Sequence, residues 1–159
     1  MINLTGEYEC KLDERGRLKI PQKLLESLGT QKNYGFIVNR GFEKNLAIYP
    51  RTVWEEKTKE INQLNIYDKQ QRDALRYFYR GATELFVDSA DRLNIPGSLL
   101  EYGGIEKDVI LFAYINFMEV WSKAEYEKYI SNEPENFSGL IQDVMDKRSS
   151  DQGNRPPSN

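Results

Sequence analysis

The segment DERGRLKIP, residues 13–21, is followed 75 positions later by DSADRLNIP, residues 88–96. When the chain is compared with itself at this offset, residues 6–29 align with residues 81–104 without a gap and are identical at eleven of twenty-four positions. Unrelated segments of ordinary composition agree at about one position in sixteen. The chain therefore contains an internal duplication, and each copy is expected to form the same supersecondary unit.

Each copy predicts the same order of strands and helix. The first copy begins with a strand in which Tyr8, Cys10 and Leu12 share one face. After the turn, a short strand RLKI leads to Pro21 and to leucines at helical spacing, and Gly29 is placed to end that helix. Two hairpins are also predicted, YGFIVNR with NLAIYP and DVILFAYI with MEVWS, because only a few residues separate the members of each pair.

Further helices are predicted outside the repeated segments. Between the copies, a helix is expected from a capping Asp68 to a terminating Gly81. After the second hairpin, Ser122 and Glu125 have the spacing of a capping box. The segment FSGLIQDVMDK beyond residue 133 is expected to form a short amphipathic helix, and the last dozen residues contain nothing to bury and are expected to be disordered.

The turn before each short strand is expected to be held by local hydrogen bonds. Asp13 is placed to accept from backbone amides ahead of it, Arg17 can reach back to the same carboxylate, and Gly16 permits a positive φ. The recurrence of the pair as Asp88 and Arg92 is consistent with a structural brace that the fold needs twice. A charged binding surface is the other interpretation, and the motif leaves both open.

The two copies differ in charge. Residues 11–23 hold five basic and two acidic side chains, a local charge of +3, whereas residues 86–98 hold one basic and two acidic side chains, a charge of −1. The whole chain has 22 Lys and Arg against 25 Asp and Glu, so no overall positive field attracts nucleic acid. A basic binding surface must therefore be local, and the sequence places it on the first copy.

Neither a catalytic nor a metal site is predicted. The chain has no histidine, no glycine-rich phosphate loop and no zinc-ligand spacing. Its one cysteine, Cys10, is interpreted as a core residue because its counterpart in the second copy is Leu85. The opening MINLTGEYEC does not have the pattern of a secretory signal, and no apolar run reaches the roughly 18 to 20 residues of a membrane helix. We expect a cytoplasmic protein without a cofactor or membrane association.

Two Asp-x-x-x-Arg turns, each leading to Leu-x-Ile-Pro and joined by a helical segment, resemble the MraZ family of bacterial cell-division regulators over residues 1 to about 130. The resemblance implies an α+β fold of tandem, pseudo-symmetric swapped-hairpin modules of the SpoVT/AbrB type, arranged as a β-barrel with flanking helices. It also implies a non-enzymatic transcriptional regulator that associates with the nucleoid. Such a regulator would bind tandem promoter repeats in double-stranded DNA upstream of the division and cell-wall genes, as a ring-like homo-oligomer.

In the family the turn motif faces DNA, so the resemblance implies a DNA-binding role for both turns of this chain. Lys19 is added because it belongs to the basic segment of residues 11–23. The implied DNA-binding residues are Asp13, Arg15, Gly16, Arg17, Lys19, Asp88 and Arg92. The family normally has glycine before the second arginine, whereas this chain has Asp91, so a DNA contact by the second turn stays open. The expected organisation is a first module at 5–52, a helical linker at 53–80, a second module at 81–124, C-terminal helices at 125–147 and a disordered tail at 148–159.

An oligomeric scaffold that binds proteins without reading DNA is the alternative function. An acidic chain with exposed aromatic residues and a flexible tail suits that role as well. The alternatives differ in what they require, because only a DNA-binding protein needs Arg15 and Arg17. Our hypothesis is that these two arginines meet phosphates or base edges, while Asp88 and Arg92 mainly pair with each other and Asp91 repels a nearby DNA backbone.

Overall fold

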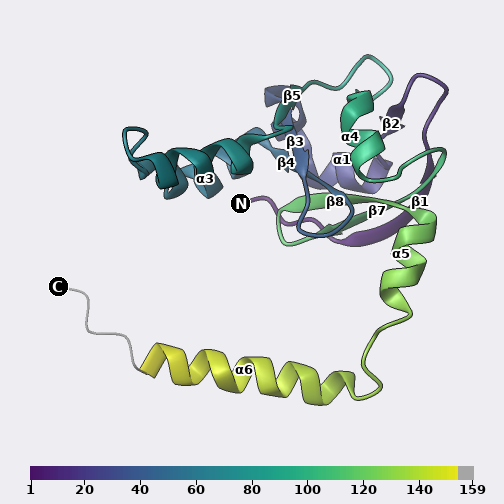
Figure 1. The fold of residues 1–159 in the computed structure, drawn as a ribbon. Helices are drawn as coiled ribbons and strands as arrows, with labels where there is room; N and C mark the ends of the chain where they lie inside the picture. Colours follow the sequence, from purple (N-terminus) through teal and green to yellow (C-terminus); the bar gives the residue numbers. More distant parts are fainter. Residues whose placement is uncertain (154–159) are drawn as a thin grey trace. The chain divides into compact units, whose positions relative to one another are not determined.

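The structure is a computed structural model that describes residues 1–153 of the chain. It divides into two compact units, residues 1–126 and the residues from Glu127 onward. The first unit contains both β-sheets and both copies of the repeat (Figure 1). None of the helices in residues 1–153 combines the length and the apolar character that crossing a bilayer requires.

A six-stranded antiparallel sheet forms the centre of the first unit. Its strand order is β1-β7-β8-β4-β3-β5. The strands are β1 (Gly6–Lys11), β3 (Phe36–Arg40), β4 (Leu46–Pro50), β5 (Thr83–Leu85), β7 (Asp108–Tyr114) and β8 (Phe117–Ser122). Both predicted hairpins are confirmed, since β3 pairs with β4 and β7 pairs with β8.

The two copies exchange their first strands. Strand β1 of the first copy pairs with β7 of the second copy, where Tyr8 lies opposite Leu111. In the same way β5 of the second copy pairs with β3 of the first copy, where Leu85 lies opposite Phe36. The hairpins meet at β4 and β8 in the middle of the sheet. The counterparts in the two copies are β1 and β5, β3 and β7, and β4 and β8. Replacing each strand by its counterpart gives the same order read from the other edge of the sheet, so the unit has a pseudo-two-fold arrangement.

The second sheet has two strands, one from each copy: β2 (Arg17–Lys19) and β6 (Arg92–Asn94). They run antiparallel, with Leu18 opposite Leu93. In the part of the chain that the structure describes, neither sheet closes on itself, so the expected β-barrel is not closed. The reason is local: β2 and β6 are three residues long and pair with each other, which leaves β1 and β5 as the edges of the larger sheet.

A short helix follows the short strand in each copy and completes the core. Helix α1 (Gln22–Leu28) begins after Pro21 and ends at Gly29, which has φ 56°. Helix α4 (Gly97–Tyr102) begins after Pro96 and ends at Gly103. The leucines of these helices enter one hydrophobic cluster with Leu18, Leu93 and the inward side chains of the six-stranded sheet. Complete burial stabilises each such leucine by about 1.5–3 kcal/mol relative to exposure.

Cys10 lies half-buried against this cluster, as the alternation along β1 predicted. Burial raises the pKa of its thiol. A thiol with a raised pKa holds less thiolate at neutral pH and is a poorer nucleophile. The environment of Cys10 is therefore that of a structural residue.

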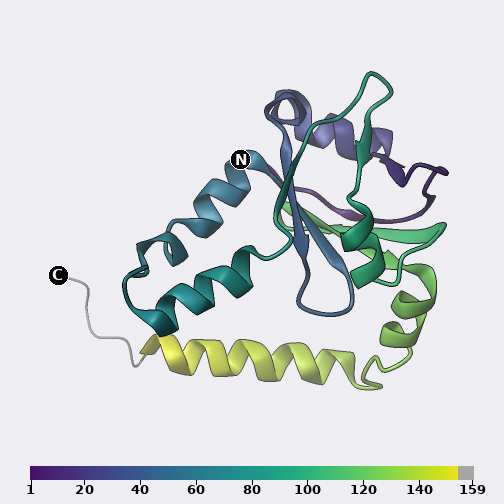
Figure 2. The ribbon, with the colours of Figure 1, turned by 45° about the horizontal axis from the view of Figure 1, so that its top comes forward.

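Figure 2 shows the remaining helices of the described residues. They are η1 (Gly29–Tyr34), α2 (Arg51–Thr58), η2 (Ile61–Gln63), α3 (Lys69–Tyr79), α5 (Lys123–Ile130) and α6 (Phe137–Gly153). Both predicted caps are present: Asp68 accepts a hydrogen bond from the Gln71 amide at 3.0 Å, and the Ser122 hydroxyl accepts one from the Glu125 amide at 3.0 Å.

Helix α6 is longer than the sequence indicated. Residues 148–153, expected to belong to a disordered tail, are helical, and residues 154–159 of that tail lie outside the described residues. Serine, aspartate and glutamine are tolerated in a helix, and the Ser150 hydroxyl donates to the carbonyl oxygen of Asp146 at 3.2 Å. Gly153 is the last residue of this helix that the structure describes.

Candidate nucleic-acid interface

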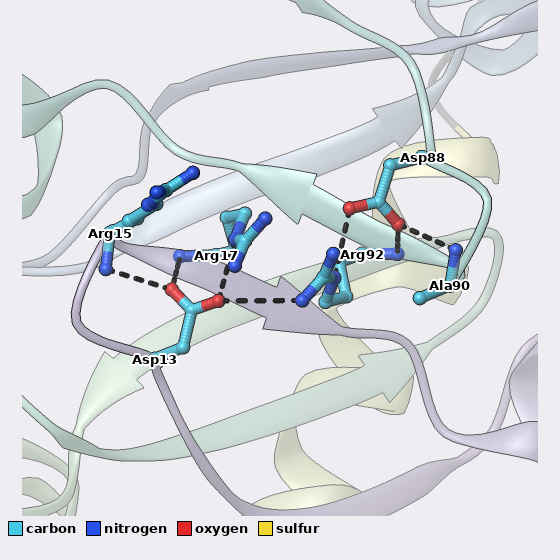
Figure 3. A network of polar contacts seen from close by, with 6 residues as sticks. All are labelled: Asp13, Arg15, Arg17, Asp88, Ala90 and Arg92. Carbon is cyan, nitrogen blue, oxygen red and sulfur yellow. Dashed lines mark hydrogen bonds and ion pairs between the residues drawn. The ribbon is translucent and has the colours of Figure 1, made fainter.

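The first turn is closed by the Asp13 carboxylate. Its Oδ1 accepts hydrogen bonds from the amides of Arg15 at 3.0 Å and Arg17 at 2.9 Å, and its Oδ2 accepts from Arg17 Nε at 2.6 Å (Figure 3). Gly16 has φ 75°, in the left-handed region that favours glycine. The hydrogen bond from the Arg17 amide, together with those from the Arg17 side chain and the Arg15 amide, lowers the pKa of Asp13. The predicted brace is thus present, and it fixes the base of the Arg17 side chain.

The second turn repeats this geometry. Asp88 accepts from the amides of Ala90 and Arg92, both at 2.9 Å, and from Arg92 Nε at 2.8 Å. The pKa of Asp88 is lowered for the same reason, with the Arg92 amide as the largest cause. Asp91 takes the place of the turn glycine and adopts φ 58°, so the backbone bend is kept without glycine. Its carboxylate lies 3.8 Å from Lys32 Nζ, which partly balances its charge.

The two turns lie at opposite ends of one antiparallel ladder formed by β2 and β6, which we call the β2–β6 ladder. The carbonyl oxygen of Gly16 accepts from the Ile95 amide at 3.2 Å, and the carbonyl oxygen of Asp91 accepts from the Ile20 amide at 3.0 Å. Each turn is therefore tied to the far end of the other copy's strand. An ion pair at 3.8 Å also joins Arg92 Nη1 to Asp13 Oδ2 across the ladder (Figure 3).

The β2–β6 ladder has one buried face and one outward face. Leu18 and Leu93 are 1% and 0% exposed and enter the core. Because side chains alternate along a strand, the neighbours of these leucines point the other way. The outward face consists of Arg17, Lys19, Arg92 and Asn94, with Arg17 opposite Asn94 and Lys19 opposite Arg92. Three cations and one amide thus stand on a two-stranded ribbon.

On the β2–β6 ladder and its turns, the basic side chains of the first copy have fewer contacts with carboxylates than the arginine of the second copy. Within residues 1–153, neither the exposed Arg15 guanidinium nor the Lys19 ammonium has a hydrogen bond or ion pair with the protein. Arg17 contacts Asp13 through Nε, and no other described residue occupies its two terminal nitrogens. Arg92 instead contacts Asp88 through Nε and Asp13 through Nη1. The position equivalent to Arg15 is Ala90, so the second turn has one cation where the first has two.

All seven residues predicted for the site lie on the β2–β6 ladder or its two turns. The structure brings them together because the two short strands pair across the copies, which the repeat alone does not require. Asn94 was not among the residues predicted from the sequence, although it is the counterpart of Lys19 at the repeat offset and shares the outward face with it. Among residues 1–153, no histidine, cysteine or carboxylate side chains gather in a way that could hold a metal ion.

Comparison with known proteins finds one family on both halves of the chain. A family model described as "MraZ protein, putative antitoxin-like" matches residues 3–77 and matches again over residues 78–147. A protein of Christiangramia forsetii named "Transcriptional regulator MraZ" is 38% identical over 146 residues, which cover 91% of this chain and 94% of that protein. A protein of Flavobacterium psychrophilum with the same name is 35% identical over 146 residues, which cover 91% of this chain and 93% of that protein.

Proposed function

The chain belongs to the MraZ family, and from this membership we propose that it is a transcriptional regulator that binds DNA sequence-specifically and is not an enzyme. Both relatives carry the name of a regulator. We further propose that it acts in the cytoplasm on the nucleoid, at promoter repeats of the division and cell-wall gene cluster. The first turn and the β2–β6 ladder would form its DNA-binding surface.

The observation that carries this proposal is the state of the first turn. Asp13 holds Arg17 through Nε while both terminal guanidinium nitrogens stay free, and Arg15 and Lys19 lie beside it without carboxylate partners among residues 1–153. Arginine reads guanine O6 and N7 with two such N–H groups, and flexible lysine and arginine side chains contact phosphates. An arginine that is oriented through Nε and keeps its terminal nitrogens unbonded can bind DNA, whereas one whose terminal nitrogens are paired with carboxylates must first break those contacts.

Assembly is part of the proposal, because a chain with net charge −3 and a few free cations makes few phosphate contacts by itself. Several subunits joined in a ring would act at high effective concentration on repeated sites. The exchange of β1 and β5 between copies supports the SpoVT/AbrB-type swapped-hairpin assignment on which the ring rests. Repeats spaced by about one helical turn, roughly 10 base pairs, would present the same DNA face to neighbouring subunits.

A mobility-shift experiment tests the proposal. The probe is a duplex that spans the promoter upstream of the chain's own gene, with a shuffled duplex of equal length as the reference. We expect a shift of the promoter duplex at physiological salt that is weakened by Arg15→Ala and by Arg17→Ala. Arg76→Ala is the matched control, because this arginine of α3 is 70% exposed and pairs with Asp73 at 3.5 Å.

The protein-binding scaffold predicts a different result. It gives no preference for the promoter duplex, and Arg15→Ala and Arg17→Ala leave any residual binding unchanged. Equal shifts of promoter and shuffled duplexes by the unaltered protein would also contradict sequence-specific regulation, because they would show binding to the phosphate backbone alone.

A further inference from the structure

Asn94 is the outward residue of the β2–β6 ladder that has no role so far. It lies at the end of β6 directly opposite Arg17, and its side chain is exposed. Within residues 1–153 its amide group has no hydrogen-bond partner in the protein. The backbone beneath it is fixed by the ladder and by the Ile95 amide, which donates to the carbonyl oxygen of Gly16. Asn94 therefore presents a free donor and a free acceptor from a rigid strand.

The ladder has the dimensions of a DNA-reading element. The major groove of B-DNA admits a two-stranded β-ribbon, and side chains on the ribbon's outward face then reach base edges. Opposed residues of an antiparallel ladder have Cα atoms about 4.5–5.5 Å apart, a distance between one and two of the roughly 3.4 Å steps that separate successive base pairs. Arg17 and Asn94 can thus contact the same or neighbouring base pairs.

We propose that Asn94 is a specificity-determining residue that reads an adenine next to the base contacted by Arg17. An asparagine amide matches adenine because it donates to N7 and accepts from N6, as arginine matches guanine. This inference rests on the proposed function. It names a further DNA-contacting residue and the base that this residue selects.

The pseudo-two-fold arrangement of the ladder gives the inference a second consequence. The counterpart of Asn94 is Lys19, which stands opposite Arg92 at the other end of the ladder. Lysine donates only and cannot bind adenine in the paired fashion of asparagine. The two ends of the outward face therefore select different bases, and the DNA sequence that one subunit reads is not a palindrome.

The test is selection from a pool of random DNA duplexes, carried out with the unaltered full-length protein and with Asn94→Ala. The unaltered protein should enrich an asymmetric motif that contains adenine beside guanine. Asn94→Ala should enrich the same motif with that adenine position relaxed. Its affinity for the unaltered protein's motif should fall roughly 5- to 150-fold, with no change on a duplex in which the adenine is replaced.

Two further variants separate base reading from other roles. Asn94→Asp keeps the shape but offers only acceptors, so the preference at that position should move from adenine to cytosine, whose N4 donates. Asn116→Ala is the matched control, since this asparagine lies between β7 and β8 in the six-stranded sheet, and it should select the original motif. Melting temperatures close to that of the unaltered protein establish that the variants are folded.

The outcomes distinguish this inference from the proposed function. If the unaltered protein enriches no motif, both are overturned. If it enriches a motif that Asn94→Ala also enriches with unchanged affinity, the regulator stands and the role of Asn94 is wrong. A loss of affinity in Asn94→Ala that is equal on motif and shuffled duplexes would likewise overturn base reading, because it would indicate a contact to the DNA backbone.

Discussion

Replacement of Arg17 separates the two kinds of DNA contact that the first turn permits. Arg17→Ala removes the guanidinium but leaves Asp13 bonded to two backbone amides at 2.9 and 3.0 Å, so the turn stays closed. Arg17→Lys keeps the positive charge but lacks the planar fork that binds two acceptors at once. The pair of variants therefore changes geometry and charge separately.

The expected size of the effect follows from the free nitrogens. With Nε held by Asp13, the two terminal nitrogens of Arg17 can make one bidentate contact to guanine, worth about 1–3 kcal/mol of discrimination in each subunit. If Arg17 reads a base, Arg17→Ala loses that amount on the operator only, and Arg17→Lys does not restore it. If Arg17 contacts a phosphate, the loss is equal on all sequences, the salt dependence falls by about one ion, and lysine largely restores binding.

Fluorescence anisotropy on a duplex with a single promoter repeat, measured over a series of salt concentrations, distinguishes these cases. Arg92→Ala is the matched comparison, because Arg92 is held by both Asp88 and Asp13 and should chiefly affect stability. The reasoning is refuted if Arg92→Ala, while folded and assembled, abolishes operator binding as completely as Arg17→Ala. In that case the second turn contacts DNA as strongly as the first.

Four further predictions concern stability, charge and assembly. Leu24→Ala should cost about 2–5 kcal/mol of unfolding free energy, because Leu24 is 1% exposed, and thermal denaturation should show a melting temperature lower by roughly 4–20 °C without altered DNA preference. Asp91→Gly should strengthen operator binding modestly in the anisotropy assay, since it removes a negative charge while glycine adopts the same positive φ; unchanged or weaker binding would contradict this. Asp13 and Asp88 have lowered pKa values in the folded protein, so their stabilising effect is complete above the unfolded-state pKa near 4 and is lost as the pH falls through the folded-state values. Melting temperatures measured from pH 5 down to pH 2 should therefore fall less steeply in Asp88→Asn than in the unaltered protein. Light scattering at micromolar concentration should report an oligomer, and a monomer would contradict the proposed ring.

Local features of the fold and site could be predicted from the sequence because short-range chemistry determines them. The Asp13 to Arg17 spacing predicted the hydrogen bonds of the turn, and Asp68 predicted a helix cap, since each involves neighbours within a few positions. Both hairpins were predicted for the same reason. The positive φ of Asp91 could not be predicted from the sequence, because glycine is the residue that ordinarily adopts it, whereas Asp91 takes φ 58°.

Long-range pairing could not be derived from the residues in the same way. The repeat shows that β1 and β5 are equivalent, but the alternation of buried side chains is satisfied whether each strand pairs with its own hairpin or with that of the other copy. The resemblance to the family implied the exchange, and the residues by themselves did not. The position of Asn94 opposite Arg17 depends on this pairing, so the residues by themselves did not place Asn94 beside Arg17.

The exchange of strands also determines when the chain can fold during synthesis. Gly6 lies opposite Ala113, so the first strand made has no partner in the sheet until more than one hundred further residues have been added. Until then β1 is unpaired, whereas β3 gains its second neighbour, β5, earlier, once residues 83–85 have been made. Contacts so distant in sequence slow folding, and unpaired strand edges can associate with the same edges of another nascent chain. The first copy is therefore not an autonomous folding unit, and two chains made side by side on one messenger RNA can exchange β1 with each other before either is complete.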